Sequence, residues 1–148
     1  MIEAAVTQVD GVPALRQLIK VRLPEGRRQV FLGSYIVPKA TCSVVIKVQA
    51  AEGAITGVRE AFVYDQLLAE NRPQDLQEPH PYGADVRGGL PFSRADAAEW
   101  DEQFPDHPLT LVRGALEQIV SSFRLTDEFR ALPGFAGPPN RRWFQRAR

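Results

Sequence analysis

Residues 30–50 read VFLGSYIVPKATCSVVIKVQA, and this stretch decides the fold class. Its first half is aromatic and β-branched and stops at Pro38, which is typical of a strand. In its second half Val44, Ile46 and Val48 share one face, and the residues between them share the other. Such a period of two is that of a strand. The stretch therefore predicts two neighbouring antiparallel strands.

The residues before this stretch add two more strands. Alternating apolar residues near the N-terminus lead into Asp10-Gly11, a dipeptide that suits a two-residue hairpin turn. Residues 19–23 then alternate apolar and cationic side chains, and residues 24–27 supply a proline- and glycine-containing turn. The sequence thus predicts an antiparallel four-stranded meander over about residues 2–50, with one apolar face that another layer must cover.

Downstream of the meander the apolar residues recur every three or four positions, which indicates helices. Ser93 and Asp96 form an approximate capping box, Pro108 suits the first turn of a helix, and Thr126 can cap another. Strands followed by helices predict an α+β fold. The sheet is expected to be covered by an amphipathic helix at about 56–70 and by C-terminal helices at about 94–104, 108–124 and 126–132.

The length of 148 residues is that of one domain. We expect a single α+β domain over residues 1–137, interrupted by a long loop at 71–92 that contains four prolines and three glycines. Residues 138–148 form a basic, aromatic C-terminal tail.

Composition argues for a bacterial protein of the cytoplasm. Cys42 is the one cysteine, so the chain can form neither an internal disulfide nor a multi-cysteine zinc site. The strand parity of Cys42 matches that of Val44, which predicts a buried thiol. The sequence shows neither a signal-like N-terminus nor an apolar run long enough to cross a bilayer. Arginine outnumbers lysine fifteen to three, as in GC-rich bacterial genomes.

The net charge is zero but unevenly distributed along the chain. It is +3 over residues 1–64, −7 over residues 65–106 and +4 over residues 107–148. The acidic middle can lie against the basic ends of the same molecule, or one patch can face a partner of opposite charge.

No catalytic motif is present, so no catalytic residues are assigned and the sequence leans against an enzyme. The alternative is a small enzyme or metal-binding domain that uses His80 and His107 with nearby carboxylates such as Asp106. A structural interpretation competes with it. His80 lies between two prolines in an exposed loop, and His107 starts a helix whose first amides Asp106 can cap.

Two segments are candidate partner-binding surfaces. One is Tyr82 in the long loop, which can serve as a rigid amphipathic contact. The other is the tail, where arginines surround two aromatic side chains; its candidate residues are Arg141, Arg142, Trp143 and Phe144. Such residues anchor protein interfaces and also stack on bases. The pI of about 6.7 disfavours a dedicated nucleic-acid binder.

We therefore predict a non-enzymatic interaction or accessory protein, such as an adaptor, a chaperone or an inhibitor-like domain, with another protein as its partner and no cofactor. Weak nucleic-acid binding by the tail is a second alternative. A four-stranded sheet with open edges also leaves room for a homo-oligomer.

Overall fold

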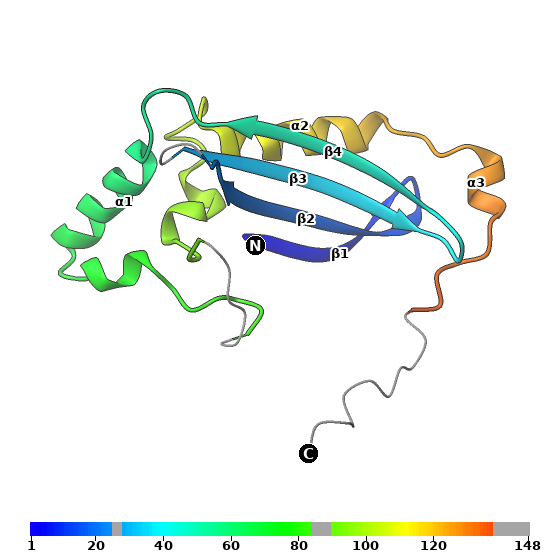
Figure 1. Cartoon of the computed structure of the whole chain (residues 1–148), viewed down its shortest axis with the longest axis horizontal. Coiled ribbons are helices and arrows are strands. Elements are labelled where there is room, and N and C mark those ends of the chain that lie inside the picture. Colours follow the sequence, from blue (N-terminus) through cyan, green and yellow to red (C-terminus); the bar gives the residue numbers. More distant parts are fainter. Residues whose placement is uncertain (25–27, 84–89, 138–148) are drawn as a thin grey trace, which may run out of the picture.

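The computed structural model describes residues 1–24, 28–83 and 90–137 and shows an α+β fold (Figure 1). Four antiparallel strands form one sheet in the order β1-β2-β3-β4. Their bounds are Glu3–Val9 (β1), Val12–Arg22 (β2), Gln29–Pro38 (β3) and Ser43–Ala51 (β4). The predicted fold class and meander are confirmed.

The hairpin between β1 and β2 turns at Asp10 and Gly11, whose φ angles are 50° and 76°. Two consecutive positive φ angles are what a two-residue hairpin turn needs, and glycine adopts such an angle without steric cost. β2 begins directly after this turn, although the sequence pattern was clear only over residues 19–23. Its first half was missed because Pro13 and Arg16 interrupt the apolar alternation.

The connection between β3 and β4 places Cys42 in a turn. The amide of Lys39 donates a hydrogen bond to the carbonyl of Cys42 (2.8 Å), and β4 begins at the next residue. Cys42 is exposed, so the expectation of a buried thiol is wrong. The parity of a strand does not extend into the turn that precedes it.

α2 (Pro108–Ser122) lies along one face of the sheet, behind β4 in Figure 1, and packs on β3 and β4. The approach is tightest at Gly33, where a Cβ atom would lie 2.5 Å from Leu116 and 2.6 Å from Val112. A residue without a side chain is therefore needed at this point. The core between helix and sheet contains almost fully buried side chains, among them Leu18, Phe31, Val37, Leu109, Val112 and Leu116.

Short helical turns replace the helix predicted at 94–104. They are the 3-10 turns η2 (Arg94–Asp96) and η3 (Ala98–Trp100), and a third such turn, η1 (Pro73–Leu76), lies in the long loop. The predicted capping box is present: Ser93 Oγ accepts from the amide of Ala95, and Asp96 accepts from the amide of Ser93. The helix stops after one turn because Ala97 is extended.

The helix predicted at 56–70 is present as α1 (Val58–Ala69), but it lies beyond one end of the sheet (Figure 1). It packs on η1 and η2 and not along the strands. Val63, Leu67 and Ala95 form a second, smaller core there. The expectation that this helix covers the sheet is therefore wrong, and α2 is the cover. An amphipathic pattern shows that one face is buried but not against which element.

A buried ionic network connects α1 with α2. The side chain of Arg59 is 1% exposed and donates hydrogen bonds to Asp101 (2.8 Å) and to the carbonyls of Ala95 and Ala97 (2.6 Å each). Arg113 of α2 donates to the same Asp101 carboxylate at 2.9 and 3.1 Å. Because two arginines share one carboxylate, the segment between the helices is held on both sides.

The last helix in the described residues is α3 (Asp127–Ala131). Thr126 caps it, as predicted, by accepting a hydrogen bond from the amide of Phe129. No helix in the described ranges has the length and apolar character to span a bilayer. Part of the long loop (84–89) and the tail with its four candidate residues lie outside the described residues. The division into a domain of residues 1–137 and a tail stays a prediction.

Candidate functional site

The face of the sheet opposite α2 carries many apolar side chains, and the described residues cover it only at one end, where Gly134 and Phe135 line a pocket with Val6 and Leu15. In the described part of the chain, no helix packs along it (Figure 1). Val6, Val21 and Val45 on this side are 87%, 46% and 56% exposed. Contiguous exposed apolar surface of this kind marks docking sites, whereas isolated exposed hydrophobic residues do not. We call the side chains that β1 to β4 direct to this side the outer face.

Strand register arranges the outer face in rows, because cross-strand partners share a face. Val6 pairs with Leu15 and Ile36 pairs with Val45, and Leu15 also pairs with Ile36, so one apolar row crosses all four strands. Lys47 is the one charged side chain that the strands place on this face. The large apolar members of the outer face are Val6, Leu15, Ile19, Val21, Val30, Leu32, Ile36 and Val45.

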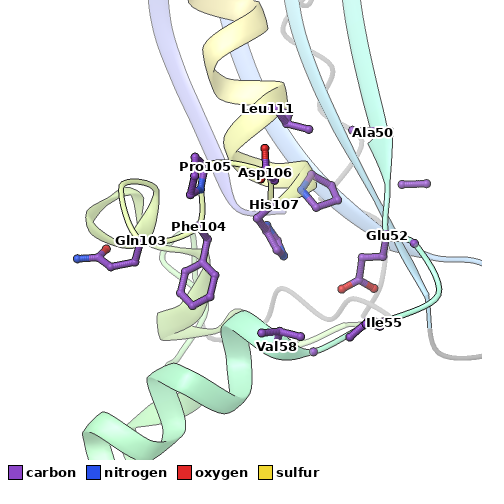
Figure 2. A pocket seen from close by; sticks show the side chains of 14 residues that line it. Ala50, Glu52, Ile55, Val58, Gln103, Phe104, Pro105, Asp106, His107 and Leu111 are labelled. Atoms are coloured by element: carbon purple, nitrogen blue, oxygen red, sulfur yellow. The ribbon is translucent and has the colours of Figure 1, made fainter.

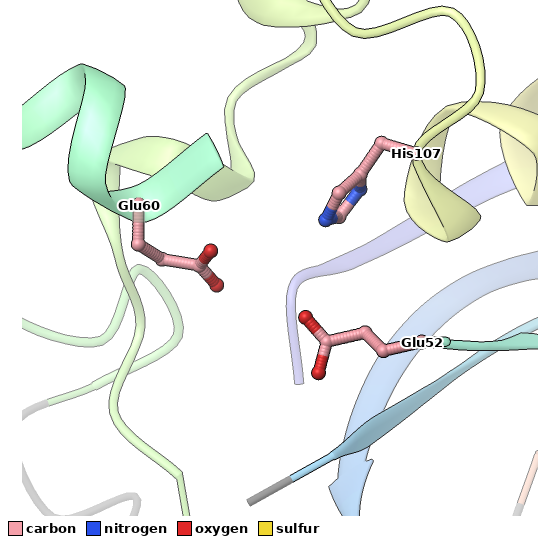
Figure 3. A group of neighbouring side chains, drawn as sticks. All are labelled: Glu52, Glu60 and His107. Carbon is pink, nitrogen blue, oxygen red and sulfur yellow. The ribbon is translucent and has the colours of Figure 1, made fainter. Parts of the chain in front are cut away.

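A second feature is a pocket of about 420 Å³ at one end of the sheet (Figure 2). It lies between the end of β4, the start of α1 and residues 103–111. Glu52, which directly follows β4, and His107, which directly precedes α2, both line it. Together with Glu60 from the first turn of α1, they place three possible ligand atoms within 4.8 Å of one another. Figure 3 shows these side chains converging from three separate elements.

His107 caps α2 with its own side chain. Its Nδ1 atom accepts a hydrogen bond from the amide of Leu109 (3.2 Å). A neutral imidazole that accepts at Nδ1 carries its proton on Nε2. Burial, reinforced by the charge of Arg59, lowers the pKa of His107 to about 4, so the ring is neutral near pH 7. The expectation that Asp106 caps this helix is therefore wrong; Asp106 is exposed and points away from the His107 ring (Figure 2).

Gln29 holds the two carboxylates. Its amide N–H donates to Glu52 Oε2 (2.7 Å), and its side-chain nitrogen donates to Glu60 Oε1 (3.3 Å). Glu52 is 5% exposed, and this burial raises its pKa; the hydrogen bond from Gln29 opposes the rise, and the charge of Glu60 adds to it. Two acidic groups are thus kept close together in a partly buried place, where their mutual repulsion is weakly screened.

Buried polar atoms without a hydrogen-bond partner are concentrated around Glu52, Glu60 and His107. Among the described residues, four buried side-chain atoms have no hydrogen-bond partner. Three of them belong to Gln29 (Oε1), Glu60 (Oε2) and His107 (Nε2). Buried polar atoms are rarely left without a partner, because the loss of water is then not compensated. Two carboxylates and a neutral imidazole are a ligand set for a divalent transition metal.

The other histidine lies elsewhere. His80 accepts a hydrogen bond at Nδ1 from the amide of Tyr82 (3.2 Å), and its ring packs edge-on against Phe92 with centroids 6.4 Å apart. The ligand group around His107 includes neither His80 nor Asp106. Its acidic members, Glu52 and Glu60, were not selected from the sequence, because nothing in the local pattern connects them to a histidine about 50 residues away.

Tyr82 fastens the long loop to the edge of the sheet. Its hydroxyl donates to the carbonyl of Ala4 (3.0 Å) and accepts from the amide of the same residue. The tyrosine is 45% exposed, so part of its ring remains accessible. Partner binding by Tyr82 stays a prediction, while its hydroxyl has a structural partner in β1.

Comparisons with family models, with curated proteins and with solved structures found no significant match. The function therefore has to be argued from these two features of the molecule.

Proposed function

We propose that this protein is a non-enzymatic interaction domain that binds through the outer face of its sheet, and that a second copy of the chain occupies this face. The observation that carries the proposal is the apolar row that crosses all four strands, with Val6 and Val45 at its ends 87% and 56% exposed. Leaving such a row in water forgoes the free energy that its burial would provide.

Charge favours a second copy as the occupant. Lys47 is the one charge on the outer face, and it lies on the edge strand β4. Two copies can therefore face each other without burying two like charges at the centre of the interface. Open antiparallel sheets pack face to face about 10 Å apart, with strand directions about 30° apart. The apolar rows of two copies would then interdigitate.

The size of the outer face is adequate for such a contact. Four strands of 7, 11, 10 and 9 residues, at about 3.3 Å per residue and about 4.8 Å spacing, present a flat area of about 600 Å². Two copies would together bury about 1,200 Å², without counting the additional area of the uneven side-chain surface. Specific interfaces begin at about this size.

The wider role that we propose is that of a bacterial, cytoplasmic accessory protein: an adaptor, a chaperone or an inhibitor-like domain. The lack of a catalytic motif in the sequence, the single cysteine and the arginine-rich composition support it. Tyr82 and the tail residues supply further candidate contacts to another protein; those in the tail are Arg141, Arg142, Trp143 and Phe144.

Sedimentation equilibrium over a range of protein concentrations tests the proposal. The full-length chain is expected to dimerise, and Val45→Asp is expected to remain monomeric, because it places a charge in the apolar row. Leu68→Asp is the matched control: Leu68 is 51% exposed, close to the 56% of Val45, but lies on α1. The proposal fails if the unsubstituted chain is a monomer throughout, or if Val45→Asp dimerises as well as the control.

A further inference from the structure

We propose that Glu52, Glu60 and His107 bind one divalent transition-metal ion, of the class that includes Zn²⁺ and Mn²⁺. This site is separate from the outer face, and the inference does not depend on the proposed function. The three residues come from the end of β4, from the first turn of α1 and from the N-cap of α2. A bound ion would therefore connect three elements at one end of the sheet (Figure 3).

The unpartnered atoms point to a ligand. Nε2 of His107 and Oε2 of Glu60 are both buried, and no hydrogen-bond partner reaches either of them among the described residues. Figure 3 shows the ring of His107 directed toward the two carboxylates. An ion between them would coordinate both atoms and would neutralise the charges of Glu52 and Glu60.

The spacing is compatible with an ion after a small adjustment. Ligand atoms about 2.1 Å from a tetrahedral ion lie about 3.4 Å from one another. The atoms of this group lie within 4.8 Å of one another, so the adjustment amounts to no more than about 1.4 Å. Side-chain rotation of a glutamate covers such a distance. Glu52 and His107 line the pocket, which leaves space for water or a small ligand as a fourth partner.

The donor types select the class of ion. An imidazole nitrogen suits Zn²⁺, Fe²⁺ and related ions, and carboxylates suit both these ions and Mn²⁺. Mg²⁺ prefers oxygen ligands in an octahedral arrangement and loses its water reluctantly. Arg59 and Arg113, which act on His107, and Lys20, which acts on Glu52, oppose cation binding. Each of them is paired with a carboxylate: both arginines with Asp101, and Lys20 with Asp96. We therefore expect Zn²⁺ to bind more tightly than Mg²⁺.

Metal binding should also change the start of α2. Without metal, the proton of His107 is on Nε2, because Nδ1 accepts from the amide of Leu109. An ion bound at Nε2 requires the proton to move to Nδ1, which then can no longer accept this hydrogen bond. Occupancy of the site is thus coupled to the tautomer of one histidine.

Titration calorimetry of the full-length, chelator-treated protein with Zn²⁺ is the first test. We expect one ion per chain, and we expect Glu60→Gln and Glu52→Gln each to weaken binding by more than about 100-fold. Even residues that only orient a metal ligand change affinity 10- to 100-fold. Glu117→Gln on the exposed side of α2 is the matched control and should bind like the unsubstituted protein. Circular dichroism verifies that each variant is folded.

Nitrogen-15 NMR of the histidine rings is the second test. The chain has two histidines, so a His80→Ala variant assigns both sets of signals. Zn²⁺ should convert His107 from the Nε2–H to the Nδ1–H form and leave His80 unchanged. The proposal is overturned if Zn²⁺ does not bind at millimolar concentration, if the glutamine variants bind as tightly as the control, or if the signals of His80 change in place of those of His107.

Discussion

The two faces of the sheet are built from the same strands and differ in what covers them. On β3, the side chains of Phe31, Tyr35 and Val37 are at most 5% exposed beneath α2, whereas their neighbours Leu32 and Ile36 face the uncovered side. Strands that are apolar on both faces are typical of sheets with two cover layers. The described part of the chain supplies one such layer, and the outer face is therefore where we expect the second.

The largest effect is expected from placing a charge on either face. Val37→Asp buries an unpaired carboxylate at a position that is fully buried, and we expect it to destabilise the protein by more than about 4 kcal/mol. Val45→Asp on the outer face should change the free energy of unfolding of the monomer by less than about 1 kcal/mol. Urea denaturation at low protein concentration measures both. Equal destabilisation by the two substitutions would contradict the difference between the faces.

Truncating two adjacent side chains of β3 compares the two faces without introducing a charge. Phe31→Ala removes a ring that is 1% exposed and should cost about 3–5 kcal/mol. Leu32→Ala, one residue further along on the outer face, should cost about 1 kcal/mol in the monomer, because the site is already partly solvated. If Leu32→Ala proved as costly as Phe31→Ala under monomeric conditions, the outer face would have to be covered within one chain.

Gly33 tests how closely α2 approaches the inner face. A methyl group there would meet Leu116 and Val112 at 2.5 and 2.6 Å, so Gly33→Ala should destabilise by about 1–3 kcal/mol through overpacking. Ser34→Ala, the adjacent residue on the outer face, should change stability by less than about 0.5 kcal/mol. Thermal unfolding of both variants decides the point, and a Gly33→Ala protein as stable as the parent would refute the close contact.

A pH-dependent effect is expected at the end of the inner core, where the ring of His107 packs edge-on against Phe31 with centroids 5.2 Å apart. The pKa of His107 is lowered from 6.5 to about 4 in the folded protein. Between these values the unfolded chain binds the additional proton, so the free energy of unfolding should fall as the pH falls from about 6.5 to about 4.

His107→Asn keeps a capping oxygen and removes this ionisable group. In the presence of chelator, its stability should therefore decrease less over the same pH range. A pKa near 6.5 for His107 by NMR, or the same pH dependence in both proteins, would show that the ring is not buried against the sheet.

Local patterns predicted much of the fold. Alternation in residues 30–50, the Asp10-Gly11 turn, and the caps at Ser93 and Thr126 depend on residues a few positions apart, and all are confirmed. The position of α1 could not be predicted in the same way, because its apolar side would be satisfied by any apolar neighbour.

The candidate site was less accessible from the sequence. His107 was identified as a possible ligand, but Glu52 and Glu60 reach it only because β4 ends where α1 and α2 begin. The sequence carries one sign of the outer face. The run VFLGSYIV is apolar at odd and even positions alike, so it already indicated a strand with two buried faces.

The central claim, that a second copy covers the outer face, is tested most directly by distances between spin labels in the assembled protein. One label replaces Lys47 on the outer face, and another, in a separate sample, replaces Gln118 on the far side of α2; both carry Cys42→Ser. Sheets that face each other lie about 10 Å apart, and each α2 adds a layer of about 10 Å behind its sheet. We predict a distance between Lys47 labels that is shorter by about 20 Å than the distance between Gln118 labels. The reverse order, or no intermolecular distance at either position, would contradict the account.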